Sequence, residues 1–407
     1  MDSDKSIYLD HQSTTPVDPR VFEAMRPYFM EKFGNPSSHI HRQGVQANQA
    51  LDTARGQVAA LINSNPEQII FTSCATESNN LAIRGFLNAN PDKGKHVIVS
   101  EIEHYSILNL AQKLKNEGLK ITVVDVDQYG MVDPEKVKRA IRKDTALISI
   151  NLASSEIGTI QPIAEIASLA RAKGIFMHAD GAIAVGNIPV DINILGVDAL
   201  TISAHNYYGP KGIGALYLRS GKRIAPLFEG GFQEFGYRSG TENLPGIVGM
   251  GVASELAQNE QKKRAKYLQK LGQKLWKGLE NEIEHISFTG HPEKRLPGHV
   301  SFWIKYIEGE SLLLMLNIKG IMASSGSACS SNLRGRDEED LAASHILTAI
   351  GVPSEFCSGS LTITMGKDNT EEEVDYFLQV MPDIVQKLLG MSPLYDDKLR
   401  GKNPYAE

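Results

Sequence analysis

Short apolar runs alternate with amphipathic segments between about residues 45 and 220. Six runs rich in β-branched residues predict buried strands, at residues 68–73, 96–100, 121–126, 146–151, 174–180 and 199–204. Between them, residues 106–118 carry apolar side chains at helical spacing and end at a glycine, and residues 134–144 open with a proline in the first helical turn. Strands that alternate with helices indicate an α/β fold, in which helices cover both faces of a largely parallel sheet.

The pattern changes after about residue 243. Residues 243–283 predict one long helix, which we expect to connect two domains. Beyond it, strands are predicted at residues 299–304, 320–325 and 360–365, and helices at 309–317, 338–350 and 371–389. These elements indicate a small α+β domain. We therefore expect a large α/β domain at residues 31–255, a small domain at 256–407, and an N-terminal segment, 1–30, that packs against the small domain.

Composition and charge narrow the classes of function. The 407 residues are 42% hydrophobic and 22% charged, which is ordinary for a globular protein. A formal net charge of −6 argues against direct nucleic-acid binding and against an anionic membrane surface. No apolar run approaches the roughly 20 residues that span a bilayer, and the acidic N-terminus lacks the apolar core of a signal peptide. These features predict a cytoplasmic protein.

The three cysteines are candidates for chemistry. Cys74, Cys329 and Cys357 are too few and too dispersed for a disulfide framework or a four-ligand zinc site, so free thiols are expected. Cys329 lies among serines and glycines, which suits an accessible thiol on a loop, although a buried inert cysteine is the alternative interpretation. Cys357 has no motif around it and is interpreted as structural.

Three predicted strand ends carry polar residues. After the first strand, the backbone at Ala75 and the side chain of Thr76 can hold a phosphate at a helix N-terminus. Asp180 ends another strand, where a carboxylate can pair with the pyridinium nitrogen of pyridoxal phosphate (PLP). Ser203 and His205 follow a third strand and can contact phosphate. Each feature alone also fits a helix cap or a turn, whereas the ordered set is typical of a PLP site.

Long segments of the chain resemble one enzyme family. They are residues 8–21, 33–44, 71–83, 156–167, 208–219, 237–251, 308–331 and 392–395. The chain resembles the class V, fold-type I PLP enzymes, specifically the bacterial cysteine desulfurases of iron–sulfur-cluster assembly and their nitrogen-fixation relatives. The resemblance implies a mainly parallel seven-stranded sheet. It also implies transfer of sulfur from L-cysteine to a persulfide on Cys329, and from there to an iron–sulfur scaffold or another acceptor protein.

The resemblance also assigns site residues. It implies phosphate contacts from Thr76, Ser203 and His205, and a further contact from Thr241 that reaches the partner subunit of a homodimer. His104 corresponds to the imidazole that stacks on the PLP ring and moves protons. The resulting cofactor-binding set is Ala75, Thr76, His104, Asp180, Ile183, Ser203, His205 and Thr241.

The sequence departs from the family pattern around the reacting end of this site. Asn206 stands where the family has the lysine that binds PLP covalently, and an amide nitrogen cannot form that bond or act as a base. Ile183 replaces a glutamine next to the ring, and Ser155 replaces an asparagine. Thr362 replaces an arginine that clamps the substrate carboxylate. Cys74, where the family usually has glycine, adds a side chain close to the ring.

Three hypotheses follow. The first is cysteine-desulfurase-like sulfur transfer, with His104 and Cys329 in the catalytic set, Asn206 in place of the lysine, and PLP held without a covalent bond. The second is a decayed desulfurase-like protein that carries sulfur or an iron–sulfur cluster on Cys329, with no other metal site expected. The third is a PLP enzyme with a changed amine substrate, since Ser155 and Thr362 alter the carboxylate clamp.

Overall fold

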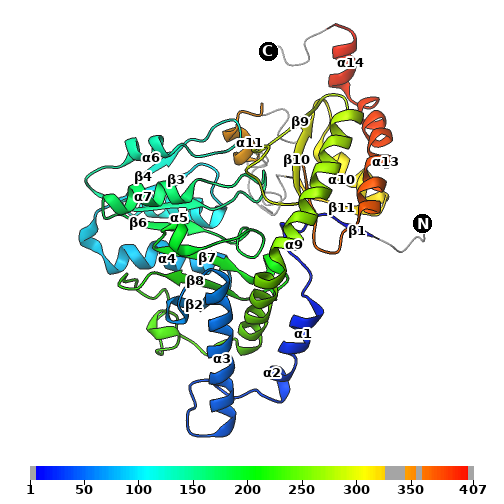
Figure 1. Ribbon diagram of the computed structural model, residues 1–407. Coiled ribbons are helices and arrows are strands. Elements are labelled where there is room, and N and C mark those ends of the chain that lie inside the picture. Colours follow the sequence, from blue (N-terminus) through cyan, green and yellow to red (C-terminus); the bar gives the residue numbers. More distant parts are fainter. Residues whose placement is uncertain (1–5, 326–343, 354–359, 402–407) are drawn as a thin grey trace.

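The largest sheet organises one half of the molecule. The computed structural model describes residues 6–325, 344–353 and 360–401. The sheet has seven strands in the order β2-β8-β7-β6-β5-β3-β4 (Figure 1). The strands are β2 (Ile69–Thr72), β3 (His96–Ser100), β4 (Lys120–Val124), β5 (Thr145–Asn151), β6 (Phe176–Asp180), β7 (Ala199–Ser203) and β8 (Gly214–Leu218). The six strands predicted from the sequence are all present within a few residues.

The seventh strand, β8, was missed by the sequence pattern. It runs antiparallel to both of its neighbours, β2 and β7, whereas β4, β3, β5, β6 and β7 are parallel to one another. A short connection after β7, which contains a single 3-10 turn (Ala204–Tyr207), returns the chain, so no α-helix marks the strand in the sequence. The sheet is therefore mainly parallel, as expected, with one antiparallel insertion.

Helices cover both faces of this sheet. They are α3 (Arg42–Leu61), α4 (Ala75–Ala89), α5 (Tyr105–Asn116), α6 (Pro134–Ala140), α7 (Ile163–Ala172) and α8 (Ile192–Leu195). Successive β3 residues point to opposite faces, so Val97 packs in the core beneath α4 and α5 while Ile98 packs in the core on the other side. Helix α6 ends earlier than the predicted residue 144, because the backbone becomes extended at Ile141.

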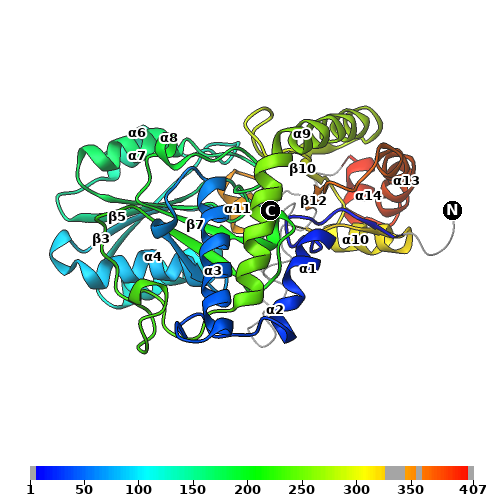
Figure 2. The ribbon, with the colours of Figure 1, turned by 60° about the horizontal axis from the view of Figure 1, so that its bottom comes forward.

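A 39-residue helix, α9 (Leu244–Glu282), runs along both halves of the molecule. It packs against α3 and α1 (Pro19–Met25) at one end, next to α2 (Pro27–Met30), and against β10 and α13 at the other end (Figure 2). The long helix predicted at residues 243–283 is thus confirmed. No helix in the described ranges has the length and apolar character needed to cross a membrane.

A three-stranded antiparallel sheet organises the other half, in the order β12-β10-β9. Its elements are β9 (Ile286–Phe288), β10 (His299–Ile304), α10 (Gly309–Ile318), β12 (Ser360–Thr364), α13 (Glu371–Leu389) and α14 (Pro393–Leu399). The short helix α11 (His345–Ala349) instead packs in the core of the large sheet. The strand predicted at residues 320–325 is only the two-residue β11 (Ile321–Met322), which pairs in parallel with β1 (Ile7–Tyr8). The first part of the helix predicted at residues 338–350 lies outside the described residues.

Candidate active site

A cavity of about 310 Å³ lies at the carboxyl ends of the parallel strands. Asn151, Asp180 and Ser203, the last residues of β5, β6 and β7, all line it, together with the first turns of α4 and α5. We call it the main cavity. Its position follows from the topology, because parallel strands bring their carboxyl ends to the same edge of a sheet.

One end of the main cavity gathers polar groups that have no protein partner. Ala75 and Thr76 begin α4, whose first turn receives no side-chain cap from Cys74. Ser203 is 1% exposed, and its Oγ atom has no hydrogen-bond partner among the described residues; the same holds for Nδ1 of His205. Buried hydroxyl and imidazole groups are normally paired, so these atoms point to a ligand. A phosphate at the N-terminus of α4 would satisfy them.

Asp180 lies at the middle of the cavity wall. One of its carboxylate oxygens accepts a hydrogen bond from Nδ2 of Asn79 at 2.8 Å, and the other accepts from the backbone N–H of Ala182 at 2.9 Å. These two bonds fix the orientation of a buried carboxylate. Ile183 lines the cavity just beyond it. The carboxylate can therefore pair with a protonated ring nitrogen.

His104 stands at the N-terminus of α5 and lines the main cavity. Its Nδ1 atom accepts from the backbone N–H of Ser106 at 3.1 Å, so the ring caps the helix and its orientation is set. The Nε2 atom is then the one that carries the proton in the neutral ring.

Asn206 is 7% exposed and lies in a 3-10 turn, Ala204–Tyr207, directly after β7. Its side-chain Nδ2 donates to the backbone carbonyl of Gln12 at 3.2 Å, and its backbone carbonyl oxygen accepts from Nδ2 of Asn187 at 3.0 Å. The side chain lines the main cavity and ties the N-terminal segment to the sheet. The neighbouring Lys211 contacts the carbonyl of Thr15 and is not among the residues that line the cavity.

The two predicted substrate-binding residues differ in their placement. Ser155 lines the main cavity, and its carbonyl accepts from Nε2 of His299 at 2.8 Å. Thr362 is 1% exposed within β12 and is not among the lining residues, because its hydroxyl donates to the carbonyl of Glu156 at 3.2 Å. The structure therefore brings Ser155, but not Thr362, to the cavity surface.

Two carboxyl groups of the cavity wall were missed by the sequence reasoning, the fully buried Glu103 and the half-buried Glu156. Burial raises the pKa of Glu103 to about 8, to which the negative charge of Asp180 contributes, and burial raises the pKa of Glu156 to about 8. Oε2 of Glu103 and Oε1 of Glu156 have no partner among the described residues. Glu103 directly precedes His104, but nothing in the sequence pattern marks it as buried. Both groups hold a proton at neutral pH.

Three other residues singled out from the sequence are not placed at this cavity by the described residues. Thr241 is exposed and does not line the cavity of its own chain. Cys329 and Cys357 lie outside the described residues. The described lining contains no lysine or arginine, and the described ranges hold no cluster of three or more His, Cys, Asp or Glu side chains suited to a metal ion.

Comparison with known proteins identifies the family and the fold. The aminotransferase class-V family model matches residues 7–377. The chain belongs to this family. Among its members, the chain is 48% identical over 396 residues to the cysteine desulfurase IscS of Methanosarcina thermophila, covering 97% of this chain and 96% of that protein. It is 47% identical to cysteine desulfurase IscS 1 of Archaeoglobus fulgidus, covering 95% and 99%.

Solved structures of class-V proteins agree with this assignment. A NifS-like protein superposes with a TM-score of 0.87 at 37% identity, covering 94% of this chain and all of that one. A NifS-like protein from Rickettsia africae superposes with a TM-score of 0.83 at 32% identity, with coverage of 94% and 100%. The resemblance to IscS- and NifS-type cysteine desulfurases and the fold-type I architecture are thus confirmed.

Class-V enzymes and cysteine desulfurases depend on PLP, and the residues of the main cavity fit this cofactor at two of three points. The unpaired Ser203 and His205 and the first turn of α4 suit its phosphate, and Asp180 suits its ring nitrogen. Burial and the nearby Lys211 lower the pKa of His205, so its ring binds as a neutral group. The third point, an amine for a covalent bond, is absent from the described lining.

Proposed function

We propose that this chain is a cysteine-desulfurase-type sulfurtransferase that holds PLP without a covalent bond to residue 206. The observation that carries the proposal is the set of unpaired buried groups, Ser203 and His205, facing the same cavity as Asp180. Buried polar atoms without a hydrogen-bond partner lower the stability of the folded protein. If the cavity no longer bound a cofactor, substitutions that pair or remove these two groups would make the protein more stable.

The chain's own residues have separate tasks in this proposal. Ser203 and the first turn of α4 bind the phosphate, and Asp180 holds the ring nitrogen protonated. PLP, when bound, supplies an electron sink for bonds at the substrate's α and β carbons. His104 and Glu103 carry exchangeable protons at the cavity wall and are the groups that can replace a lysine as proton carrier, since the amide of Asn206 cannot do so.

The proposed reaction is balanced without an external oxidant. The Cβ–S bond of L-cysteine breaks and a bond forms between its sulfur and Sγ of Cys329. One of the two thiol protons stays on the outer sulfur of the persulfide and the other goes to Cβ, so the three-carbon unit leaves as alanine. A structure of SspA, 32% identical and similar with a TM-score of 0.77 over 90% of this chain and all of that one, was determined in complex with cysteine. An acceptor protein, for example an iron–sulfur scaffold, would then take the sulfur from Cys329. Because Cys329 carries the sulfur as a persulfide, the proposed reaction does not need an iron–sulfur cluster bound to this residue.

The decisive experiment combines a visible spectrum with product analysis. The protein incubated with PLP and desalted should retain cofactor absorbance, release alanine from cysteine, and carry one extra sulfur on Cys329 by mass spectrometry. Cys329→Ser should keep the absorbance and lose the sulfur. Absence of both absorbance and alanine would refute the proposal, and pickup of sulfur from a persulfide donor would then favour a carrier without turnover.

The variant Asn206→Lys tests how far the site has diverged. A lysine at this position should produce the spectral shift of a covalent PLP linkage. It should restore little additional activity, because Ile183 and Ser155 remain altered. Full activity on this single change would show that the other replacements are neutral for catalysis.

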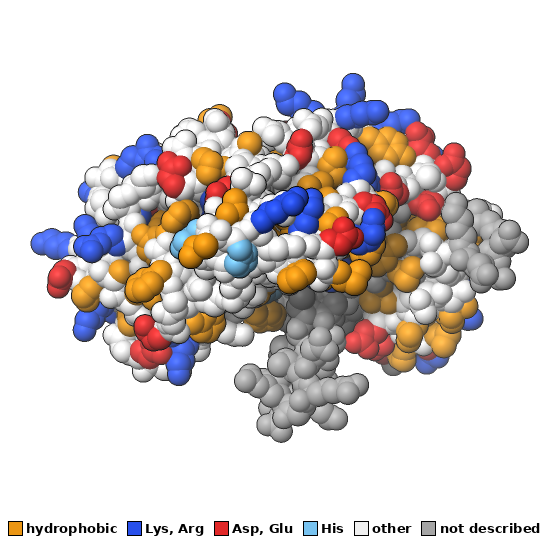
Figure 3. Space-filling view, turned by 90° about the horizontal axis from the view of Figure 1, so that it is seen from below, with side chains coloured by type: hydrophobic (Ala, Val, Ile, Leu, Met, Phe, Trp, Pro, Cys, Tyr) orange, Lys and Arg blue, Asp and Glu red, His pale blue; other side chains and the backbone are white. Residues whose placement is uncertain are grey.

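We further propose that the protein is a homodimer. Apolar side chains on α1, α2 and the following segment are largely exposed: Phe22 is 54% exposed, Phe29 60%, Met30 73%, Phe33 66% and Ile40 97%. Figure 3 shows hydrophobic side chains at several places on the face that these elements help to form. A monomer seldom exposes such large apolar groups together, so burial by a second copy explains them. Light scattering of the wild type and of Phe29→Asp, which should dissociate, tests this.

A changed substrate remains a second candidate, on one specific observation. The described wall of the main cavity presents unpaired oxygens of Glu103, Asn151 and Glu156 and no arginine or lysine. Such a wall favours a ligand that donates hydrogen bonds, for example an amine without a carboxylate. Parallel turnover of cysteine and cysteamine, followed by the release of alanine or ethylamine, decides between the two candidates.

A further inference from the structure

A second, smaller cavity lies behind Asn206. Its volume is about 50 Å³, and Gln12, Ile183 and Asn206 form walls of both this cavity and the main one. We call it the rear cavity. Since a buried water needs roughly 10–15 Å³ measured in this way, there is room for a few water-sized groups but not for an amino acid.

Arg264, on α9, is the one residue with a formal charge in the described wall of the rear cavity. It is 8% exposed. Its guanidinium donates to the carbonyl of Gly186 and stacks on the ring of Tyr208, with 5.2 Å between the guanidinium carbon and the ring centroid. A guanidinium has five N–H donors, so most of them have no acceptor among the described residues.

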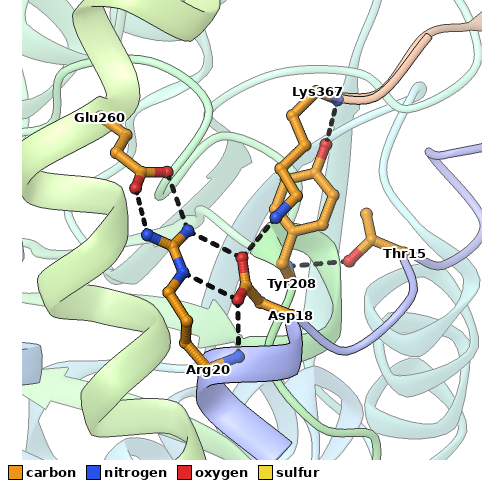
Figure 4. Close-up of polar contacts among 6 residues, drawn as sticks. All are labelled: Thr15, Asp18, Arg20, Tyr208, Glu260 and Lys367. Atoms are coloured by element: carbon orange, nitrogen blue, oxygen red, sulfur yellow. Dashed lines mark hydrogen bonds and ion pairs between the residues drawn. The ribbon is translucent and has the colours of Figure 1, made fainter.

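The carboxylates near Arg264 form ion pairs with other cations. Asp18 is bound by Arg20 at 2.9 Å and by the ammonium group of Lys367, and Glu260 is bound by Arg20 at 2.6 Å (Figure 4). No carboxylate lies within 4.0 Å of Arg264 in the described ranges. Asp18 and Glu260 therefore act on the Arg264 charge only from beyond ion-pair distance, and its direct contacts are a carbonyl and an aromatic face, which compensate a desolvated ion weakly.

The histidines of the rear-cavity wall add no charge to that of Arg264. Burial lowers the pKa of His11 to about 4 and that of His299 to about 3, so both rings are neutral at physiological pH. The amide of Asn206 uses one of its two N–H groups on Gln12 and keeps the other. A lysine at position 206 would have placed a second cation in the wall of the rear cavity. With asparagine there, Arg264 is the one formally charged residue of the described wall.

We propose that the rear cavity binds a small monovalent anion against the Arg264 guanidinium. Chloride and hydrosulfide share the charge and the size that this space requires, whereas cysteine and PLP are too large for it. The anion supplies the negative charge that Arg264 lacks. The site is distinct from the cofactor-binding end of the main cavity and does not depend on whether PLP binds.

Bromide is a suitable probe because it scatters anomalously and resembles chloride. Crystals of the full chain soaked in sodium bromide should show an anomalous peak in the rear cavity beside Arg264. In solution, the melting temperature should rise saturably with bromide at constant ionic strength, with gluconate as the inert counter-anion. Competition by sodium hydrosulfide under alkaline conditions and by sodium chloride then distinguishes the two natural ligands by their relative affinities.

Substitutions distinguish specific binding of bromide at Arg264 from a general effect of salt on stability. Arg264→Met keeps the length of the side chain and should weaken bromide binding by about tenfold or more, as expected for loss of one charged hydrogen-bond donor. Arg264→Lys should retain binding. Lys270→Met removes a cation that binds Glu371 from the same helix, α9, without touching the cavity wall, Asp18 or Glu260, and should leave bromide affinity unchanged. Only ordered water in the wild-type cavity, or an equal bromide response in Arg264→Met, would overturn the proposal.

Discussion

Replacing Glu103 by glutamine should stabilise the protein at alkaline pH. The carboxyl group is fully buried beside Asp180, and its pKa is raised from 4.5 to about 8. The folded state therefore keeps a proton that the unfolded state loses above about pH 4.5. Stability is greatest below that pH, falls by about 1.4 kcal/mol for each pH unit between about 4.5 and 8, and is constant above it.

The total stability lost through Glu103 is at most about 5 kcal/mol, from 1.36 kcal/mol for each unit between 4.5 and about 8. Glutamine cannot ionise, and its amide oxygen can still accept from the backbone N–H of Asn151, which lies 3.0 Å from Glu103 Oε1. We therefore expect Glu103→Gln to gain about 2–5 kcal/mol relative to the wild type between pH 5 and pH 9.

Urea unfolding across this pH range measures the effect. Glu67→Gln, at an exposed position, is the matched control and should follow the wild type. A difference between Glu103→Gln and the wild type that stays constant with pH would refute the reasoning, since it would mean that Glu103 titrates alike in the folded and unfolded states.

Three further substitutions test other parts of the structure. Arg55→Met removes the cation that binds the buried carboxylate of Glu234 through two contacts of 2.7 Å, and leaves it the backbone N–H of Phe71. Chemical unfolding should show a loss of about 3–5 kcal/mol, and a loss near zero would contradict this. Gly186→Ala places a Cβ 2.6 Å from Tyr207 at a φ of +82° and should lower stability by about 1–3 kcal/mol, unless the turn relaxes. Asp180→Asn should weaken PLP binding about tenfold in equilibrium dialysis, and unchanged affinity would argue against its contact with the ring nitrogen.

The architecture of the large sheet was largely predictable, because local patterns carry it. Alternating β-branched and amphipathic segments predict parallel strands with crossover helices, and parallel strands place Asp180 and Ser203 at one edge. Strand β8 escaped prediction because no α-helix separates it from β7 and because its other neighbour, β2, lies far away in the sequence. The division of the chain at residues 30 and 255 stays a prediction.

The amino-acid sequence by itself determined the order of the elements, the positions of the polar strand ends and the absence of a lysine at residue 206. The tertiary structure alone decided what surrounds them. Asn206 is tied to Gln12, 194 residues away, and Glu103 keeps its proton because distant segments exclude water from it. Arg264 lies in the wall of the rear cavity, and the nearby carboxylates of Asp18 and Glu260 bind Arg20 instead. Burial and the absence of a partner arise from contacts between segments that are remote in the chain, and no local pattern encodes them.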